Sequence, residues 1–191
     1  MDTTALLTAD DLFLPELAEP DLPHELWRGE LRLVTPASGP HGAVCSRLLG
    51  AMAQHVYPRN LGALFTEGTP FLLERGPDTV LCPDVAFVAR ERLPPGGLAG
   101  RFMEVAPDLA IEVLSPGDRP AEVRAKAAAY LRLGVRAVWL LDPRVRAVRT
   151  RACVGRRIIE TTLTEGDTLD GGEVLPGFRV PVAFLFADVR R

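Results

Sequence analysis

Three side chains, Asp84, Glu112 and Lys126, have the types and settings of a metal site with a neighbouring cation. Two carboxylates in apolar segments are ligands that Mg²⁺ accepts while it keeps positions for water and for a phosphate group. A lysine ammonium is a compact charge that can point at a single oxygen or water. The set would therefore suit attack of a metal-bound water on a phosphate ester.

Lys126 stands out because it is the only lysine among 22 basic residues, all the others being arginine. Arginine serves wherever a positive charge is enough, so the one lysine favours a role that needs an ammonium. Lys126 also follows Glu122 by four positions on an expected helix. A surface pair of this kind would contribute only about 0.2–0.5 kcal/mol, and it stays open as the alternative.

The two carboxylates lie in apolar surroundings. Glu112 is in DLAIEVL, residues 108–114, which is typical of a strand in the buried centre of a sheet. An ionised carboxylate there is costly unless it is paired or binds a cation, so Glu112 either ligates a metal or pairs with an arginine beneath the sheet. Asp84 follows Pro83, and it is either a second metal ligand or a strand-start residue that accepts backbone hydrogen bonds.

The periodicity of the chain predicts the elements that position these side chains. Helices are expected from TADDL, with Thr8 as N-cap and Asp11 in a capping box, over residues 40–57, and from about 119 or 120 to 133, ended by Gly134. Strands are expected at 25–34 in two pieces about Arg28 and Gly29, at 63–67, 70–74, 80–89, 108–114 and 137–142, in a hairpin of 145–151 and 156–162, and in a β-rich tail. This order predicts one α/β (α+β) domain, residues 1–191, with a mixed sheet flanked by helices and residues 1–24 as a helical and extended arm.

Composition excludes some classes of protein. Hydrophobic content of 47% and charged content of 25% are ordinary for a globular protein. No apolar run approaches the roughly 18 residues of a membrane span, and the acidic N-terminus does not resemble a signal peptide, so we expect a cytoplasmic protein with no membrane partner. Cys45, Cys82 and Cys153 have no zinc-site spacing, and we expect all three to be small buried apolar groups.

The net charge of −3 hides a strong asymmetry. Residues 119–157 contain 11 basic side chains and only two acidic ones, Glu122 and Asp142. A basic segment on an acidic protein is a possible contact surface for a nucleic-acid backbone. The residues predicted for this role are Arg119, Arg124, Arg144 and Arg146. Alternatively, these arginines pair with acidic partners elsewhere in the fold or across an oligomer interface.

Three segments resemble the Uma-type family, which belongs to the restriction-endonuclease-like PD-(D/E)XK superfamily. They are PDVAFV (83–88), PDLAIEVLSPGDR (107–119) and KAAAYLRLGVRAVWLLDP (126–143). The opening ELWRGELRL, the helix that starts at His41 and the ending LPGFRVPVAFLF fit the same pattern. The resemblance covers nearly the whole chain and implies a restriction-endonuclease-like fold.

The resemblance also implies site residues. The superfamily's metal ligands fall on Asp84 and Glu112, with the carbonyl of Val113, and the implied cofactor is Mg²⁺ or Mn²⁺. The superfamily's usual lysine position is Leu114 in this chain, and Lys126 fits a lysine supplied from the following helix. A further acidic residue falls on Glu30 and a helix-start histidine on His41. These two stay open as an exposed strand residue and a helix N-terminal hydrogen-bonding or packing group.

The predicted function is metal-dependent hydrolysis of DNA phosphodiester bonds, catalysed by Asp84, Glu112, Lys126 and Glu30. A symmetric homodimer would let two sites engage two strands. Two alternatives remain open from the sequence. One is a nucleic-acid-binding module that has the fold without turnover, and the other is an interaction or structural protein whose basic segment forms a dimer interface.

Overall fold

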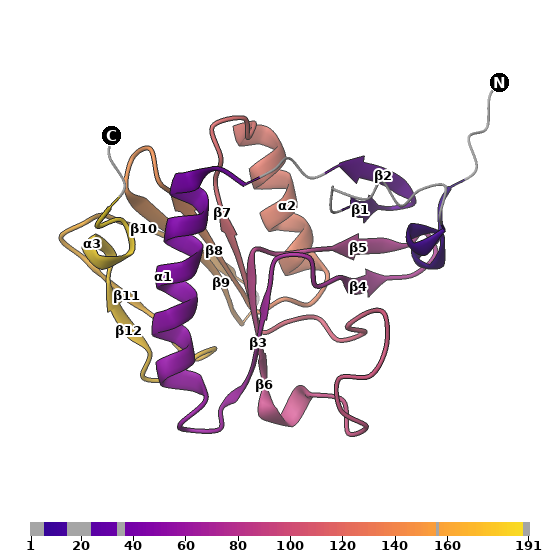
Figure 1. Ribbon diagram of the computed structural model, residues 1–191, viewed down its shortest axis with the longest axis horizontal. Helices are drawn as coiled ribbons and strands as arrows, with labels where there is room; N and C mark the ends of the chain where they lie inside the picture. Colours follow the sequence, from indigo (N-terminus) through magenta and orange to yellow (C-terminus); the bar gives the residue numbers. More distant parts are fainter. Residues whose placement is uncertain (1–5, 15–23, 34–36, 156, 189–191) are drawn as a thin grey trace.

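A six-stranded mixed sheet forms the centre of the protein (Figure 1). The computed structural model describes residues 6–14, 24–33, 37–155 and 157–188. The strands lie in the order β10 (Arg157–Leu163), β9 (Ala147–Val154), β8 (Ala137–Asp142), β7 (Leu109–Val113), β6 (Val85–Ala89) and β3 (Gly62–Thr66). Only β7 and β8 pair in parallel within this sheet, and the helix that connects them supplies Lys126.

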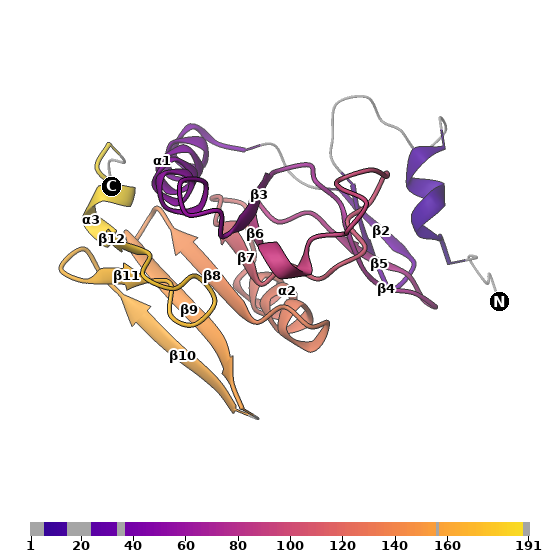
Figure 2. The ribbon, with the colours of Figure 1, turned by 90° about the horizontal axis from the view of Figure 1, so that it is seen from below.

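Two long helices cover opposite faces of this sheet (Figure 2). Helix α1 (Gly39–Val56) packs on the face that carries Leu109 and Ile111, while α2 (Pro120–Arg132) packs on the face that carries Ala110. Successive strand residues point to opposite faces, so Glu112 lies on the α2 side together with Ala110. The sheet alternation thus directs the Glu112 side chain toward the helix that bears Lys126.

A second, four-stranded sheet lies beside the first, in the order β2 (Glu30–Leu33), β1 (His24–Trp27), β5 (Thr79–Leu81) and β4 (Phe71–Glu74). Its first two strands form the hairpin that the sequence predicts. Arg28 and Gly29 both have positive φ, +50° and +83°, as a two-residue turn of type I′ requires. Leu26 packs on the short 3₁₀ helix η1 (Ala9–Phe13), which leaves the opposite face of the hairpin for Glu25 and Trp27.

Replacing Gly29 by alanine is expected to lower the free energy of unfolding by about 1–3 kcal/mol, because a side chain is strained at this φ. A Cβ atom there would also lie only 2.6 Å from the Cβ of Leu6. Urea denaturation measures the loss. Gly68→Ala is the matched control, since Gly68 has a φ of +84° with no atom within 4 Å of the added Cβ. An equal loss in both variants would contradict the role of the Leu6 contact.

The remaining elements confirm most sequence expectations and correct one. Helix η1 has its predicted capping contact, because the Asp11 carboxylate accepts hydrogen bonds from the backbone and hydroxyl of Thr8. The β-rich tail gives β11 (Thr168–Asp170) and β12 (Arg179–Pro181), but Val182–Leu185 forms a helical turn, α3, and is not a strand. The remaining element is a second 3₁₀ helix, η2 (Arg90–Arg92).

Of the three cysteines expected to be buried, Cys82 is buried, Cys45 is only partly buried, and Cys153, near the end of the β9–β10 hairpin, is exposed. Much of the expected N-terminal arm, residues 1–5 and 15–23, lies outside the described residues. Within the described ranges, no helix has both the length and the apolar character needed to cross a membrane.

Candidate functional site

An open pocket of about 230 Å³ lies where β7, the N-terminal part of α2, the β1–β2 hairpin and the start of α1 meet. It is lined by the charged side chains Glu25, His41, Asp84, Glu112, Asp118 and Lys126, among others. Asp84, just before β6, Glu112 on β7 and Lys126 on α2 are therefore neighbours in space, as their types suggested from the sequence.

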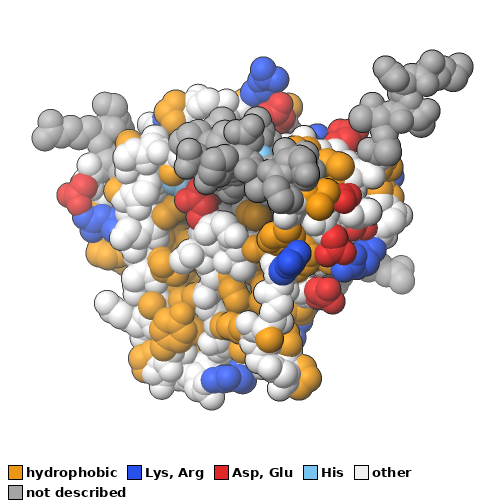
Figure 3. All heavy atoms as spheres, turned by 45° about the vertical axis from the view of Figure 1, so that its right-hand side comes forward, with side chains coloured by type: hydrophobic (Ala, Val, Ile, Leu, Met, Phe, Trp, Pro, Cys, Tyr) orange, Lys and Arg blue, Asp and Glu red, His pale blue; other side chains and the backbone are white. Residues whose placement is uncertain are grey.

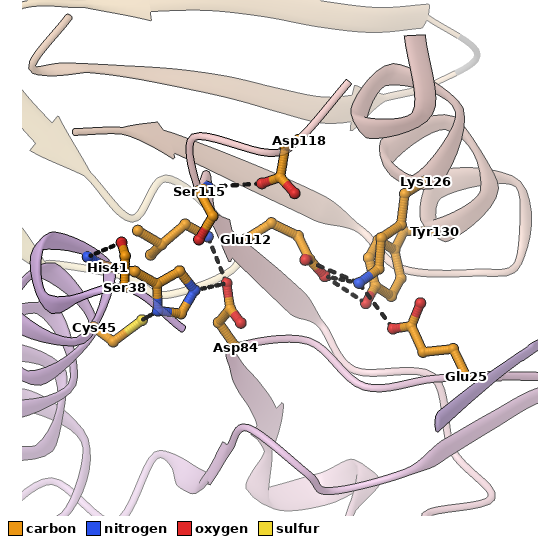
Figure 4. A network of polar contacts seen from close by, with 11 residues as sticks. Glu25, Ser38, His41, Cys45, Asp84, Glu112, Ser115, Asp118, Lys126 and Tyr130 are labelled. Atoms are coloured by element: carbon orange, nitrogen blue, oxygen red, sulfur yellow. Dashed lines mark hydrogen bonds and ion pairs between the residues drawn. The ribbon is translucent and has the colours of Figure 1, made fainter. Parts of the chain in front are cut away.

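Lys126 is held between two carboxylates (Figure 4). Its Nζ lies 2.9 Å from the Glu112 carboxylate and 2.8 Å from Oε1 of Glu25. The three side chains are largely buried, at 17%, 16% and 6% exposure respectively. Burial disfavours the ammonium, but the Glu112 and Glu25 charges outweigh that effect and raise the pKa of Lys126. The lysine is therefore a fixed cation within the pocket.

Glu112 is the carboxylate at the centre of this cluster. Its Oε1 accepts a hydrogen bond of 2.8 Å from the hydroxyl of Tyr130, a fully buried residue one turn after Lys126 on α2. Burial raises the pKa of Glu112 to about 8, although Lys126 acts in the opposite direction, and the charges of Asp84 and Glu25 add to the rise. Burial also raises the pKa of Tyr130 well above its usual value, which keeps the hydroxyl a donor.

Asp84 lies just before β6 and is fixed through one of its oxygens. Its Oδ2 accepts a hydrogen bond of 2.6 Å from the backbone N–H of Val113 and lies 3.0 Å from Nε2 of His41. The contact with Asp84, and then the one with Cys45, raises the pKa of His41 to about 10, despite the opposing effect of burial. His41 is therefore a cation next to Asp84. Its backbone N–H also reaches the side chain of Ser38, the N-cap of α1.

The structure does not bring Glu30 to this cluster, and the acidic residue that it supplies instead is Glu25. The hairpin register pairs Trp27 with Glu30 and Glu25 with Arg32, so these four side chains share one face. Glu30 lies at the turn end and is exposed, whereas Glu25 lies two residues deeper, where the Cys82 backbone N–H donates to it at 2.9 Å. The sequence could predict which face of the hairpin carries the acidic residues. The position of each glutamate along the hairpin decides which carboxylate enters the pocket.

The position of Lys126 has a simple structural reason. Glu112 and Leu114 lie on the same side of β7, and Leu114 packs in the core between that strand and α2. A lysine supplied from α2 therefore approaches Glu112 from the same side as one at position 114 would. The alternative surface pair does not form, because Glu122 contacts Arg119, at 3.4 Å, and Lys126 contacts the two buried glutamates.

Sequence reasoning missed Glu25 and Tyr130 as members of the cluster. Tyr130 follows Lys126 by four positions, and that spacing places both side chains on one face of α2. The sequence signal for Glu25 was its position two residues before Trp27 on a strand, which places both side chains on one face, while Leu26 lies on the opposite, apolar face. Asp118 precedes α2 without capping it, because its carboxylate accepts a hydrogen bond of 2.7 Å from the backbone N–H of Ser115 and the N-cap residue is Arg119.

Five of the ten arginines in the basic segment pair with carboxylates in the described part of the fold. Arg119 contacts Glu122, Arg144 contacts Asp142 and Arg146 contacts Glu165. Two further pairs are Arg136 with Asp108 and Arg151 with Glu160. On the face of the molecule in Figure 3, basic side chains mostly lie next to acidic ones. Of the four predicted nucleic-acid contacts, Arg119 lines the pocket and Arg124 is exposed on α2.

The donor set fits a hard divalent cation. Asp84 and Glu112 present carboxylates to one pocket, and the Asp84 charge contributes to the raised pKa of Glu112. Oxygen ligands of this kind suit Mg²⁺ or Mn²⁺. A carboxylate cluster that is costly to bury becomes favourable when a cation binds to it.

A solved structure shares this architecture. A protein from Anabaena variabilis, described as a "putative nuclease belonging to DUF820", superposes with a TM-score of 0.75 at 20% sequence identity. The match covers 86% of this chain and 89% of the other. At this identity the similarity shows the fold alone, and it confirms the mixed sheet flanked by helices that the sequence predicts.

The family follows from the sequence match. Residues 10–183 match the Uma2 family, which is described as "Putative restriction endonuclease", and the chain belongs to this family. A search of curated proteins finds no match.

Proposed function

We propose that this protein is a Mg²⁺- or Mn²⁺-dependent endonuclease that hydrolyses phosphodiester bonds of DNA. The observation that carries the proposal is the meeting of Asp84, Glu112 and Lys126 in one pocket, although they come from the start of β6, from β7 and from α2. Family membership and the nuclease description of a protein with the same fold support the reaction class.

Asp84 and Glu112, with the carbonyl of Val113, would hold the metal ion. When bound, the ion would polarise the phosphoryl oxygen and lower the pKa of a water ligand. Lys126 would orient the attacking water and offset negative charge that develops on the phosphate. Glu25 would keep the Lys126 ammonium in place, because its Oε1 lies 2.8 Å from Nζ. Arg119 and Arg124, at the N-terminal end of α2, would contact the nucleic-acid backbone.

Cleavage of plasmid DNA tests the proposal. The wild-type protein is expected to nick plasmid with Mg²⁺ and to stop when the metal is chelated. Asp84→Ala and Lys126→Arg are each expected to lower the rate by about 100-fold or more, because a fixed electrostatic contact is lost. Glu122→Gln is the matched control on α2, since Glu122 is exposed and contacts Arg119. Equal rates in all four proteins would refute the proposal.

The same preparations separate the endonuclease from the two alternatives. A binding module without turnover would bind DNA in a salt-dependent way with no metal, and Glu112→Ala would leave that binding unchanged. An interaction protein would not bind DNA at physiological salt. The homodimer and the cytoplasmic location stay predictions, which sedimentation and fractionation would test.

A further inference from the structure

We propose that His41 and Cys45 form a second metal site, which binds a thiolate-preferring divalent ion of the zinc class, with Asp84 as the residue that orients the histidine. The two residues are four positions apart on α1, so their side chains lie on one face of the helix. His41 is buried and lines the pocket, and Cys45 is partly buried beside it. Together with Asp84 they offer ligand atoms that all lie within 4.8 Å of one another.

The distance between the two donors is already right for a shared tetrahedral ion. Cys45 Sγ lies 3.7 Å from His41 Nδ1. Zinc bonds of about 2.3 Å to sulfur and about 2.1 Å to nitrogen, at a tetrahedral angle, place the two donor atoms about 3.6 Å apart. An ion can therefore replace the hydrogen bond between them with little movement of either side chain.

The other ring nitrogen of His41 is arranged as it is in histidines that ligate zinc. Such a histidine usually donates its free N–H to a carboxylate, which fixes the ring and makes the ligating nitrogen more basic. Here Nε2 lies 3.0 Å from Oδ2 of Asp84, and that oxygen is itself held by the Val113 N–H. The capping of α1 by Ser38 fixes the His41 backbone. Nδ1 carries a proton in the metal-free protein, and it is the nitrogen that an ion would bind as it displaces that proton.

The site differs chemically from the neighbouring carboxylates. A nitrogen and a sulfur donor favour Zn²⁺ and Co²⁺ over Mg²⁺, which prefers oxygen. Because Asp84 uses Oδ2 toward His41, its Oδ1 stays available to the proposed Mg²⁺ site. The two sites thus share Asp84 through different oxygens. The second site does not depend on nuclease activity of the protein.

Titration of the purified protein with Co²⁺ tests the site, because Co²⁺ takes zinc sites and, unlike Zn²⁺, absorbs light. The wild-type protein is expected to gain a near-ultraviolet thiolate-to-cobalt band at one equivalent, which Zn²⁺ removes and excess Mg²⁺ does not. Cys45→Ser is expected to abolish the band, and His41→Gln to weaken Co²⁺ binding by more than about tenfold. Asp84→Asn is expected to keep the band with affinity lowered by about 10- to 100-fold, as for the loss of a partner that orients a ligand.

Cys153→Ser is the matched control, because that thiol is exposed and lies on the far β9–β10 hairpin. It is expected to leave the band unchanged. Thermal unfolding of each variant establishes that it is folded before titration. A wild-type protein without the band, a band that survives in Cys45→Ser, or one that is lost in Cys153→Ser would overturn the proposal. The readout uses no DNA, so failure of the endonuclease proposal leaves the result intact.

Discussion

Glutamine in place of Glu112 is expected to lower Mg²⁺-dependent cleavage of plasmid by about 10³-fold while the protein stays at least as stable as the wild type. The loss in rate corresponds to about 4 kcal/mol of transition-state stabilisation, which is the size expected when a metal ligand is removed. Stability is kept because Lys126 retains Glu25 at 2.8 Å, and because glutamine can still accept the Tyr130 hydrogen bond. The free energy of unfolding is expected to change by less than about 1 kcal/mol at pH 5, where the Glu112 carboxyl is protonated in the fold.

The dependence of stability on pH gives this prediction a second readout. Burial raises the pKa of Glu112 from 4.5 to about 8. Its contribution to stability is therefore fully present below pH 4.5 and is lost as the pH rises through about 8. Glu112→Gln lacks this loss, so the variant should gain stability relative to the wild type between pH 5 and pH 9.

Urea denaturation at pH 5 and at pH 9 measures the difference in the free energy of unfolding between the variant and the wild type. Glu122→Gln is the control, since it neutralises an exposed carboxylate near the pocket and should leave both the cleavage rate and the pH profile unchanged. A variant that cleaves like the wild type, or a stability difference that shrinks with rising pH, would contradict the assigned role and environment of Glu112.

The sequence predicted the main elements of the fold because hydrophobic periodicity and punctuating residues agreed. The apolar run around Glu112 is a central strand, and the helix that Gly134 ends is α2. The tail was less predictable. The residues of Val182–Leu185 are as apolar as those of a buried strand, so their sequence does not distinguish a strand from a helical turn. The helical turn places Val182 and Leu185 in the same core as Leu48 of α1.

The candidate site was predictable in part for a physical reason. A carboxylate in a buried strand needs a partner, so Glu112 could be singled out from its neighbours alone. Glu25 and Glu30 flank the same turn and share one face, and no local pattern distinguishes them. Only the docking of the hairpin against β5, which brings the Cys82 N–H to Glu25, makes the choice. Such long-range contacts do not appear in local sequence patterns.

Methionine in place of Lys126 is expected to lower the free energy of unfolding by about 3–5 kcal/mol at pH 10, which is the usual cost of removing one partner from a buried ion pair. Methionine keeps the apolar stem of the side chain, so packing changes little. Among the described residues, Lys126 is the one basic side chain with an ion pair to Glu25 or Glu112. Its removal leaves two carboxylates buried without a cation.

A lower pH should restore part of the loss. Without Lys126 the pKa of Glu112 is expected to rise further, because the main effect that lowers it is gone. Protonation then removes the unpaired charge up to a higher pH than in the wild type, so the deficit of Lys126→Met should be smaller at pH 8 than at pH 10. Urea denaturation at both values measures the deficit, with Glu122→Gln again as the control.

A double-mutant cycle separates the ion pair from packing. Lys126→Met combined with Glu112→Gln should be less destabilised than Lys126→Met alone, because one of the two uncompensated carboxylates is then neutral. The remaining deficit would belong to Glu25. If Lys126→Met unfolds within about 0.5 kcal/mol of the wild type, the ammonium is not held between buried carboxylates, and the fixed cation on which the proposed chemistry depends is absent.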